Sequence, residues 1–157
     1  MRRITSPALM PRKQYLTLVL LTISTHLFAQ GDVPYNVKIQ FMDEYISASS
    51  ASWNKVNTEY LVSFNHQSHF KKASYASNGT RMFLETKLMS LAEAPQAVGQ
   101  AIKRRYRSYM IDDIWKTETS DDVIYKLLIR KEDKIYSVEF FQTGKQKSKT
   151  RICQQRT

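Results

Sequence analysis

The chain has 157 residues, of which 42% are hydrophobic, and few glycines and prolines, a composition typical of a folded globular protein with one domain or two small ones. Its 24 basic and 14 acidic side chains give a net charge of +10, which falls far short of a nucleic-acid-binding tail, so we expect no nucleic-acid partner. The single cysteine, Cys153, excludes an internal disulfide, and a hydrophobic core must hold the fold together.

Residues 1–29 have the layout of a secretory signal peptide. Basic residues without an acid come first, a mostly apolar run covers Tyr15 to Phe28, and the small residue Ala29 follows. The run is too short for a comfortable membrane span. We therefore expect cleavage after Ala29 and a periplasmic or secreted protein, with an uncleaved anchor or a buried helix as the alternatives. Translation could begin at Met1 or at Met10.

The mature part of the chain opens with a predicted amphipathic helix over Val33 to Tyr45. Pro34 suits the first helical turn, where its missing N–H has no helical partner. Val37, Phe41 and Tyr45 recur every four residues and form one apolar stripe. Strands are then predicted over residues 53–56, 59–65, 70–76 and 81–87, and Asn78-Gly79 marks a hairpin turn between the last two.

The second half of the chain repeats this order. Residues 94–108 predict a helix with the apolar stripe Val98, Ile102 and Tyr106. Strands follow over residues 114–119, 123–130, 134–141 and 145–153, and Thr143-Gly144 supplies the last turn.

The two halves match at several positions, among them Val33-Pro34 with Ala94-Pro95 and Trp53 with Trp115. We therefore predict an α+β fold: a tandem repeat of a helix plus a four-stranded antiparallel sheet, with the helices packed on one face of a continuous curved sheet. The expected units are residues 30–90 and 91–157. A tryptophan on the first strand of a unit is expected to pack under the helix, and we predict this for Trp115.

This ordered set resembles the PepSY-like family of exported bacterial proteins, which are related in fold to the β-lactamase-inhibitor protein. The residues that carry the resemblance are Val33-Pro34 to Tyr45, Trp53, Tyr60 to Phe64 and Asn78-Gly79, then Ala94-Pro95 to Tyr106, Trp115, Tyr125 to Ile129, Tyr136 to Phe140 and Thr143-Gly144. The resemblance implies two tandem units, no enzymatic activity, and a binding or inhibitory role outside the cytoplasm. The Ser/Ala-rich turn before Trp53 departs from the family pattern.

The sheet face away from the helices is the predicted functional surface. Period-two alternation places apolar and charged side chains together on it, a mixture typical of protein-binding patches. The alternative is that a loop covers this face, or that a register shift by one residue exchanges the two faces. We predict that an unidentified protein or peptide, with a hydrolase as one option, binds there through Leu61, Phe83, Lys126, Leu128, Arg130, Glu139 and Phe141.

The sequence gives weaker support for catalysis, metal binding or docking on the cell envelope. No phosphate-binding glycine loop, Gly-x-Ser-x-Gly or His-Glu-x-x-His occurs, so we expect neither an enzyme nor a cofactor. His66 and His69 could share a metal but lack further ligands nearby, which leaves a small metal-binding envelope protein as one alternative function. Another alternative is a structural envelope component that docks on an anionic surface through a basic strand, whose alternating residues are expected to share one face: Lys145, Lys147, Lys149 and Arg151. The simpler reading of this strand is protection of a sheet edge.

Overall fold

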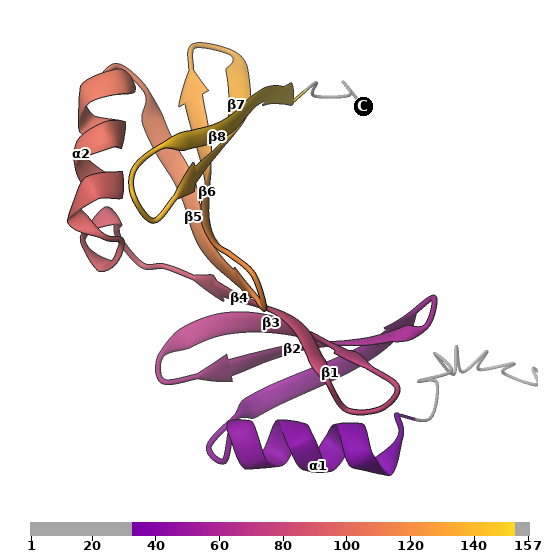
Figure 1. The fold of residues 1–157 in the computed structure, drawn as a ribbon. Coiled ribbons are helices and arrows are strands. Elements are labelled where there is room, and N and C mark those ends of the chain that lie inside the picture. The colour runs from indigo at the N-terminus through magenta and orange to yellow at the C-terminus, as the bar shows by residue number, and fades with distance from the viewer. Residues whose placement is uncertain (1–32, 153–157) are drawn as a thin grey trace, which may run out of the picture.

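The computed structural model describes residues 33–152, which form one eight-stranded antiparallel sheet and two short α-helices (Figure 1). Every strand pairs with its neighbours in chain order, from β1 to β8. The elements are α1 (Tyr35–Glu44), β1 (Ser49–Val56), β2 (Glu59–His66), β3 (His69–Ala76), β4 (Arg81–Lys87), the short 3₁₀ helix η1 (Leu91–Glu93), α2 (Gln96–Arg105), β5 (Met110–Thr119), β6 (Val123–Lys131), β7 (Lys134–Phe141) and β8 (Gln146–Ile152).

The predicted tandem repeat of a helix plus a four-stranded sheet is wrong. Strands β4 and β5 pair directly, from Phe83 with Thr119 to Lys87 with Trp115, so all eight strands belong to one sheet. The backbone N–H and C=O groups of β4 and β5 form hydrogen bonds with each other across this junction. The first half of the chain therefore has no free sheet edge at which a separate unit could end. The fold is therefore one large sheet with two short helices of 10 residues each.

Both helices begin behind a proline and bury one stripe. The carbonyl of Pro34 accepts hydrogen bonds from the N–H groups of Val37 and Lys38, which closes the first turn of α1. The N–H of Tyr45 donates to the carbonyl of Phe41 and ends the helix. α2 starts in the same way behind a proline and also ends on a tyrosine, Tyr106. Each helix is shorter than predicted because these local bonds close it within 10 residues.

The buried side chains form two clusters on the helix-covered face of the sheet. The cluster under α1 contains the fully buried Phe64 and Tyr75, and the cluster under α2 contains the fully buried Leu127 and Phe140. In Figure 1 the sheet bends between β4 and β5, and both helices lie on the outer side of the bend. The inner side of the bend is the face that no helix covers.

Glycines close two of the hairpins as the sequence predicts. Gly79 has φ +90° in the β3–β4 turn, and Gly144 has φ +79° in the β7–β8 turn. These are conformations that L-residues with a side chain adopt at a cost. Gly144 has a further constraint, because a Cβ added there would lie 2.5 Å from the carbonyl oxygen of Ala97 in α2.

Candidate functional site

The candidate site is the sheet face opposite the helices. Cross-strand partners lie on the same face, so the register can be followed from strand to strand. Leu61 pairs with Ser74, which pairs with Phe83, whereas the buried Val62 pairs with Ala73 on the helix side. The same tracing across β5, β6 and β7 places every predicted binding residue on the uncovered face: Leu61, Phe83, Lys126, Leu128, Arg130, Glu139 and Phe141. That they contact a partner stays a prediction.

An aromatic and cationic group lies in the central part of this face, which we call the Trp115 cluster: Phe70, Lys72, Lys87 and Trp115. The indole of Trp115 on β5 stands edge-on to the ring of Phe70 on β3, with 6.0 Å between the ring centroids. The Lys72 Nζ lies 4.9 Å from the indole centroid and the Lys87 Nζ lies 5.9 Å from it. Two ammonium groups therefore flank one half-buried indole within cation–π distance.

The predicted packing of Trp115 under a helix is wrong. Its cross-strand partners are Lys87 and Lys126, which both lie on the uncovered face. The neighbouring Ile114 takes the buried place and is only 6% exposed. Trp53, by contrast, does lie on the helix side, with its ring edge-on to Phe41 at 5.3 Å. Successive residues of a strand point to opposite faces, so an apolar Ile114 facing the core would have placed Trp115 on the uncovered face.

Charges of both signs surround the cluster. Lys87 Nζ lies 2.6 Å from Asp113 Oδ1. Arg130 holds Asp112 with two hydrogen bonds, of 2.7 Å from Nη2 and 3.1 Å from Nε. The hydrogen bonds with Arg130 lower the pKa of the Asp112 carboxyl and raise that of the guanidinium. Within residues 33–152, Lys72 makes no ion pair, so its ammonium group is available to a partner.

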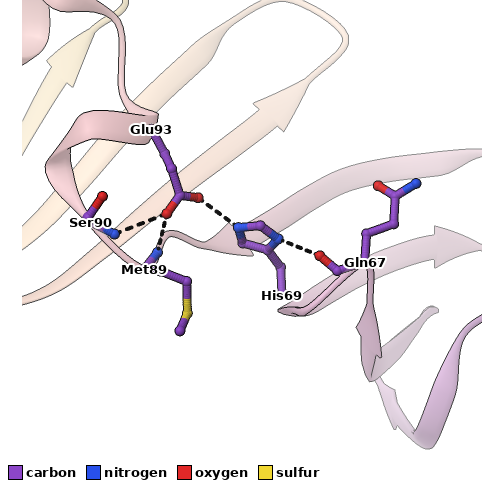
Figure 2. Close-up of polar contacts among 5 residues, drawn as sticks. All are labelled: Gln67, His69, Met89, Ser90 and Glu93. Atoms are coloured by element: carbon purple, nitrogen blue, oxygen red, sulfur yellow. Dashed lines mark hydrogen bonds and ion pairs between the residues drawn. The ribbon is translucent and has the colours of Figure 1, made fainter.

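Both ring nitrogens of His69 form hydrogen bonds with other residues of the protein (Figure 2). Its Nε2 lies 2.7 Å from Glu93 Oε2 and its Nδ1 lies 2.8 Å from the Gln67 carbonyl oxygen. The other oxygen of Glu93 accepts hydrogen bonds from the backbone N–H groups of Met89 and Ser90. The hydrogen bond with Glu93 raises the pKa of His69, and the same bond lowers the pKa of Glu93.

The two histidines do not converge on a metal position with other ligands. The ring of His66 packs edge-on against the ring of Tyr45, with 5.3 Å between the ring centroids. The buried Nδ1 of His66 has no hydrogen-bond partner in the part of the chain that the structure describes. Across residues 33–152, no three His, Cys, Asp or Glu side chains come together as a metal site. A protein zinc site needs three or four ligands, so the geometry gives His66 and His69 no support as ligands.

The basic residues late in the chain do not share one face, contrary to the prediction. A register shift between Glu139 and Phe140 interrupts the alternation of β8. Lys149 pairs with Val138 on the helix side, whereas the Nζ of Lys147 lies 5.9 Å from the ring of Phe141 on the uncovered face. The basic stripe is therefore divided between the two faces.

Ser74 and Glu59 form a hydroxyl–carboxylate pair on the sheet, but the serine is shielded from solvent. The Ser74 hydroxyl donates a hydrogen bond to the carboxylate of Glu59. Ser74 has no exposed surface, and a nucleophile must meet its substrate. The pair joins β2 to β3 and has the features of a structural contact.

The predicted signal peptide and Cys153 lie outside the described residues. Between residues 33 and 152, no helix is both long enough and apolar enough to cross a membrane.

Solved structures share this fold. A protein from Bacteroides eggerthii, provisionally described as periplasmic, superposes with a TM-score of 0.72 at 17% identity over 78% of this chain and 91% of its own. A DUF2874 family protein from Bacteroides ovatus gives 0.70 at 20% identity, covering 77% and 89% of the two chains. A BLIP-like protein from Bacteroides fragilis gives 0.69 at 17% identity, covering 77% and 87%. BLIP is the β-lactamase-inhibitor protein.

The fold is thus BLIP-like, as the resemblance predicts. At 17–20% identity the likeness is one of fold alone. No family model matches the chain, and no curated protein matches it in sequence. Membership of the PepSY-like family stays a prediction.

Proposed function

We propose that this chain is a non-catalytic, exported binding protein that engages a protein or peptide through the uncovered face of its sheet. The observation that carries the proposal is the Trp115 cluster. An indole on a central strand, with Phe70 at its edge and two lysines over it, lies on the inner side of the bend, where no helix packs (Figure 1).

The composition of this face supports a macromolecular partner. Aromatic residues are enriched at protein interfaces, where they combine a large apolar surface with little conformational freedom to lose. Phe141, Leu128 and Leu61 lie on the same face of the sheet as half-buried apolar groups, and Lys126 and Arg130 lie exposed on it. A partner loop could bury the rings in the centre while the charges remain at the rim.

Export is supported by the pattern of residues 1–29 and by the periplasmic description of the protein from Bacteroides eggerthii. The BLIP-like protein from Bacteroides fragilis brings in a hydrolase as one partner class. That step rests on fold analogy, so inhibition needs its own assay. We expect fractionation to recover a mature protein whose N-terminus is Gln30.

The binding experiment compares substitutions on the two faces. Trp115→Ala, Leu128→Asp and Phe141→Asp alter the uncovered face, and Met42→Asp is the matched control, because Met42 on α1 is 60% exposed on the outer side. The wild-type protein captures its partner from the native envelope, and the partner is then purified and titrated against each variant. We expect about tenfold or weaker binding for Trp115→Ala, in line with central aromatic anchors, and no change for Met42→Asp.

Equal affinity of all folded variants would contradict the sheet face as the binding surface. In parallel, a purified serine β-lactamase hydrolysing a chromogenic substrate tests the inhibitor class. Unchanged hydrolysis at excess protein would exclude this β-lactamase as a partner. The titrations would still test whether the sheet face binds another protein.

Neither alternative function gains support from the described contacts. Both ring nitrogens of His69 already have partners, Gln67 and Glu93, which weakens the metal-binding proposal. The division of Lys147 and Lys149 between two faces removes the continuous basic stripe that envelope docking required.

A further inference from the structure

Three tyrosines surround one ammonium group at the end of α2. The Nζ of Lys149 lies 4.5 Å from the ring centroid of Tyr136, and 5.2 Å from the centroids of both Tyr106 and Tyr109. All three distances are within the range of cation–π attraction. We call Tyr106, Tyr109 and Tyr136 the tyrosine cage.

Separate elements supply the walls of the cage, so the fold builds it. Tyr106 caps the C-terminus of α2, and its carbonyl accepts the N–H of Tyr109 at 2.9 Å, which fixes the turn before β5. Tyr136 comes from β7, next to β8, which carries Lys149. The ring of Tyr109 stands at 81° to that of Tyr106 and at 74° to that of Tyr136. Nearly perpendicular rings form the walls of a box.

The cage holds its cation through rings and not through a carboxylate. Across residues 33–152, Lys149 makes no ion pair, and its one polar contact is a 3.5 Å hydrogen bond from Nζ to the Tyr109 hydroxyl. A primary ammonium group is compact and strongly hydrated, so it gives up water to enter such a box. A quaternary ammonium group spreads its charge over methyl groups, and aromatic cages recognise that chemistry.

We propose that the tyrosine cage is a binding site for a quaternary ammonium group, which Lys149 occupies in the free protein. This site is independent of the uncovered sheet face, because Lys149 pairs with Val138 on the helix side. Lys149 lies on the edge strand β8 and its side chain is exposed, so it can leave the cage without unfolding. A bound ligand must compete with this tethered lysine, which lowers the apparent affinity by the fraction of time that the cage is filled.

Choline tests the site with the purified protein, and its neutral isostere 3,3-dimethylbutan-1-ol has the same shape without the charge. Binding is followed by the NMR shifts of the tyrosine ring protons during titration. We expect saturable shifts with choline and none with the isostere. Lys149→Ala empties the cage and should strengthen choline binding by about tenfold if the lysine fills it nine-tenths of the time. Lys147→Ala on the same strand is the matched control and should leave the affinity unchanged.

The rings are tested by Tyr136→Leu, which keeps apolar bulk but removes the π face, and should weaken choline binding by about tenfold or more. Tyr136→Phe keeps the face and should retain binding, so it distinguishes a lost ring from a lost fold. Lys131, whose Nζ lies 5.7 Å from the Tyr109 centroid, is a second lysine near the cage, and Lys131→Ala should not reproduce the effect of Lys149→Ala.

Equal shifts with choline and its isostere would overturn the proposal, because they would show apolar contact without recognition of charge. Unchanged choline affinity in Lys149→Ala would also overturn it. Neither result would bear on partner binding through the Trp115 cluster.

Discussion

The imidazole of His69 and the carboxylate of Glu93 join segments that lie 24 positions apart in the chain, with 2.7 Å between Nε2 and Oε2 (Figure 2). The bond ties the start of β3 to η1, the short helix that leads into α2. Because Glu93 also accepts hydrogen bonds from two backbone N–H groups, its carboxylate is held in position to receive the imidazole. The contact links the first strands of the sheet to the segment that positions the second helix.

We predict that this bond makes the stability of the protein depend on pH. The pKa of His69 is raised from 6.5 on folding, so its contribution is fully present below pH 6.5 and is lost as the pH rises through the folded-state pKa. The pKa of Glu93 is lowered from 4.5, so its contribution is present above pH 4.5 and is lost as the pH falls through its folded-state value. The pair should stabilise the fold most between pH 4.5 and 6.5.

Thermal melting of the wild type and of His69→Gln across this range measures the effect. The difference in Tm should be largest near the middle of the window and should shrink above it. Glu93→Gln should give a similar profile, because it removes the other partner. A Tm difference that stays constant at all pH values would mean that the bond carries no charge-dependent stability.

The two tryptophans should respond differently to truncation. Trp53 packs against Phe41 and Tyr75 on the helix side, so Trp53→Ala should lower the free energy of unfolding by about 3 kcal/mol. Trp115→Ala removes cation–π contacts on the uncovered face and should cost about 1 kcal/mol. Urea denaturation gives both values. A larger loss for Trp115→Ala would place that indole in a structural role.

The single sheet should make the whole molecule unfold together. Phe140→Ala removes a fully buried ring from the cluster under α2 and should cost about 3–5 kcal/mol. In a Trp115→Phe background, the fluorescence of Trp53 reports on the other cluster. We expect the Trp53 signal to shift to the same lower midpoint, because the pairing of β4 with β5 joins the two regions. Lys103→Ala, an exposed change on α2, is the control.

A Trp53 midpoint that does not move in Phe140→Ala would contradict this coupling. It would show that the strands on each side of the β4–β5 junction unfold separately.

The two turn glycines should differ in the cost of a methyl group. Gly79→Ala meets only ordinary contacts, at 3.5 Å and beyond, so its positive φ should account for a loss of about 1–2 kcal/mol. Gly144→Ala has a similar φ but would bring Cβ to 2.5 Å from the Ala97 carbonyl oxygen. Overpacking of this kind adds about 1–3 kcal/mol. Denaturation midpoints that are equal for the two variants would mean that α2 moves away freely.

The sequence predicted the helices, strands and turns better than it predicted their division into two repeated units. Pro34, Gly79 and Gly144 act through their own backbone restrictions, and these rules hold within a few residues. The alternation of β2 and of β6 likewise decided which side chains share a face, and the face predicted from it agrees with the register. Such features could be predicted because they depend on neighbours along the chain.

The sequence by itself therefore determined the order of helices and strands, the turn glycines and the membership of the uncovered face. The tertiary structure alone decided the register in which β4 pairs with β5, the division of Lys147 and Lys149 between the two faces of the sheet, and the entry of Lys149 into a box of tyrosines. These outcomes depend on pairing and on irregularities such as the bulge between Ile111 and Asp113. A single extra residue there resets the alternation, and only the partner strand shows where it is inserted.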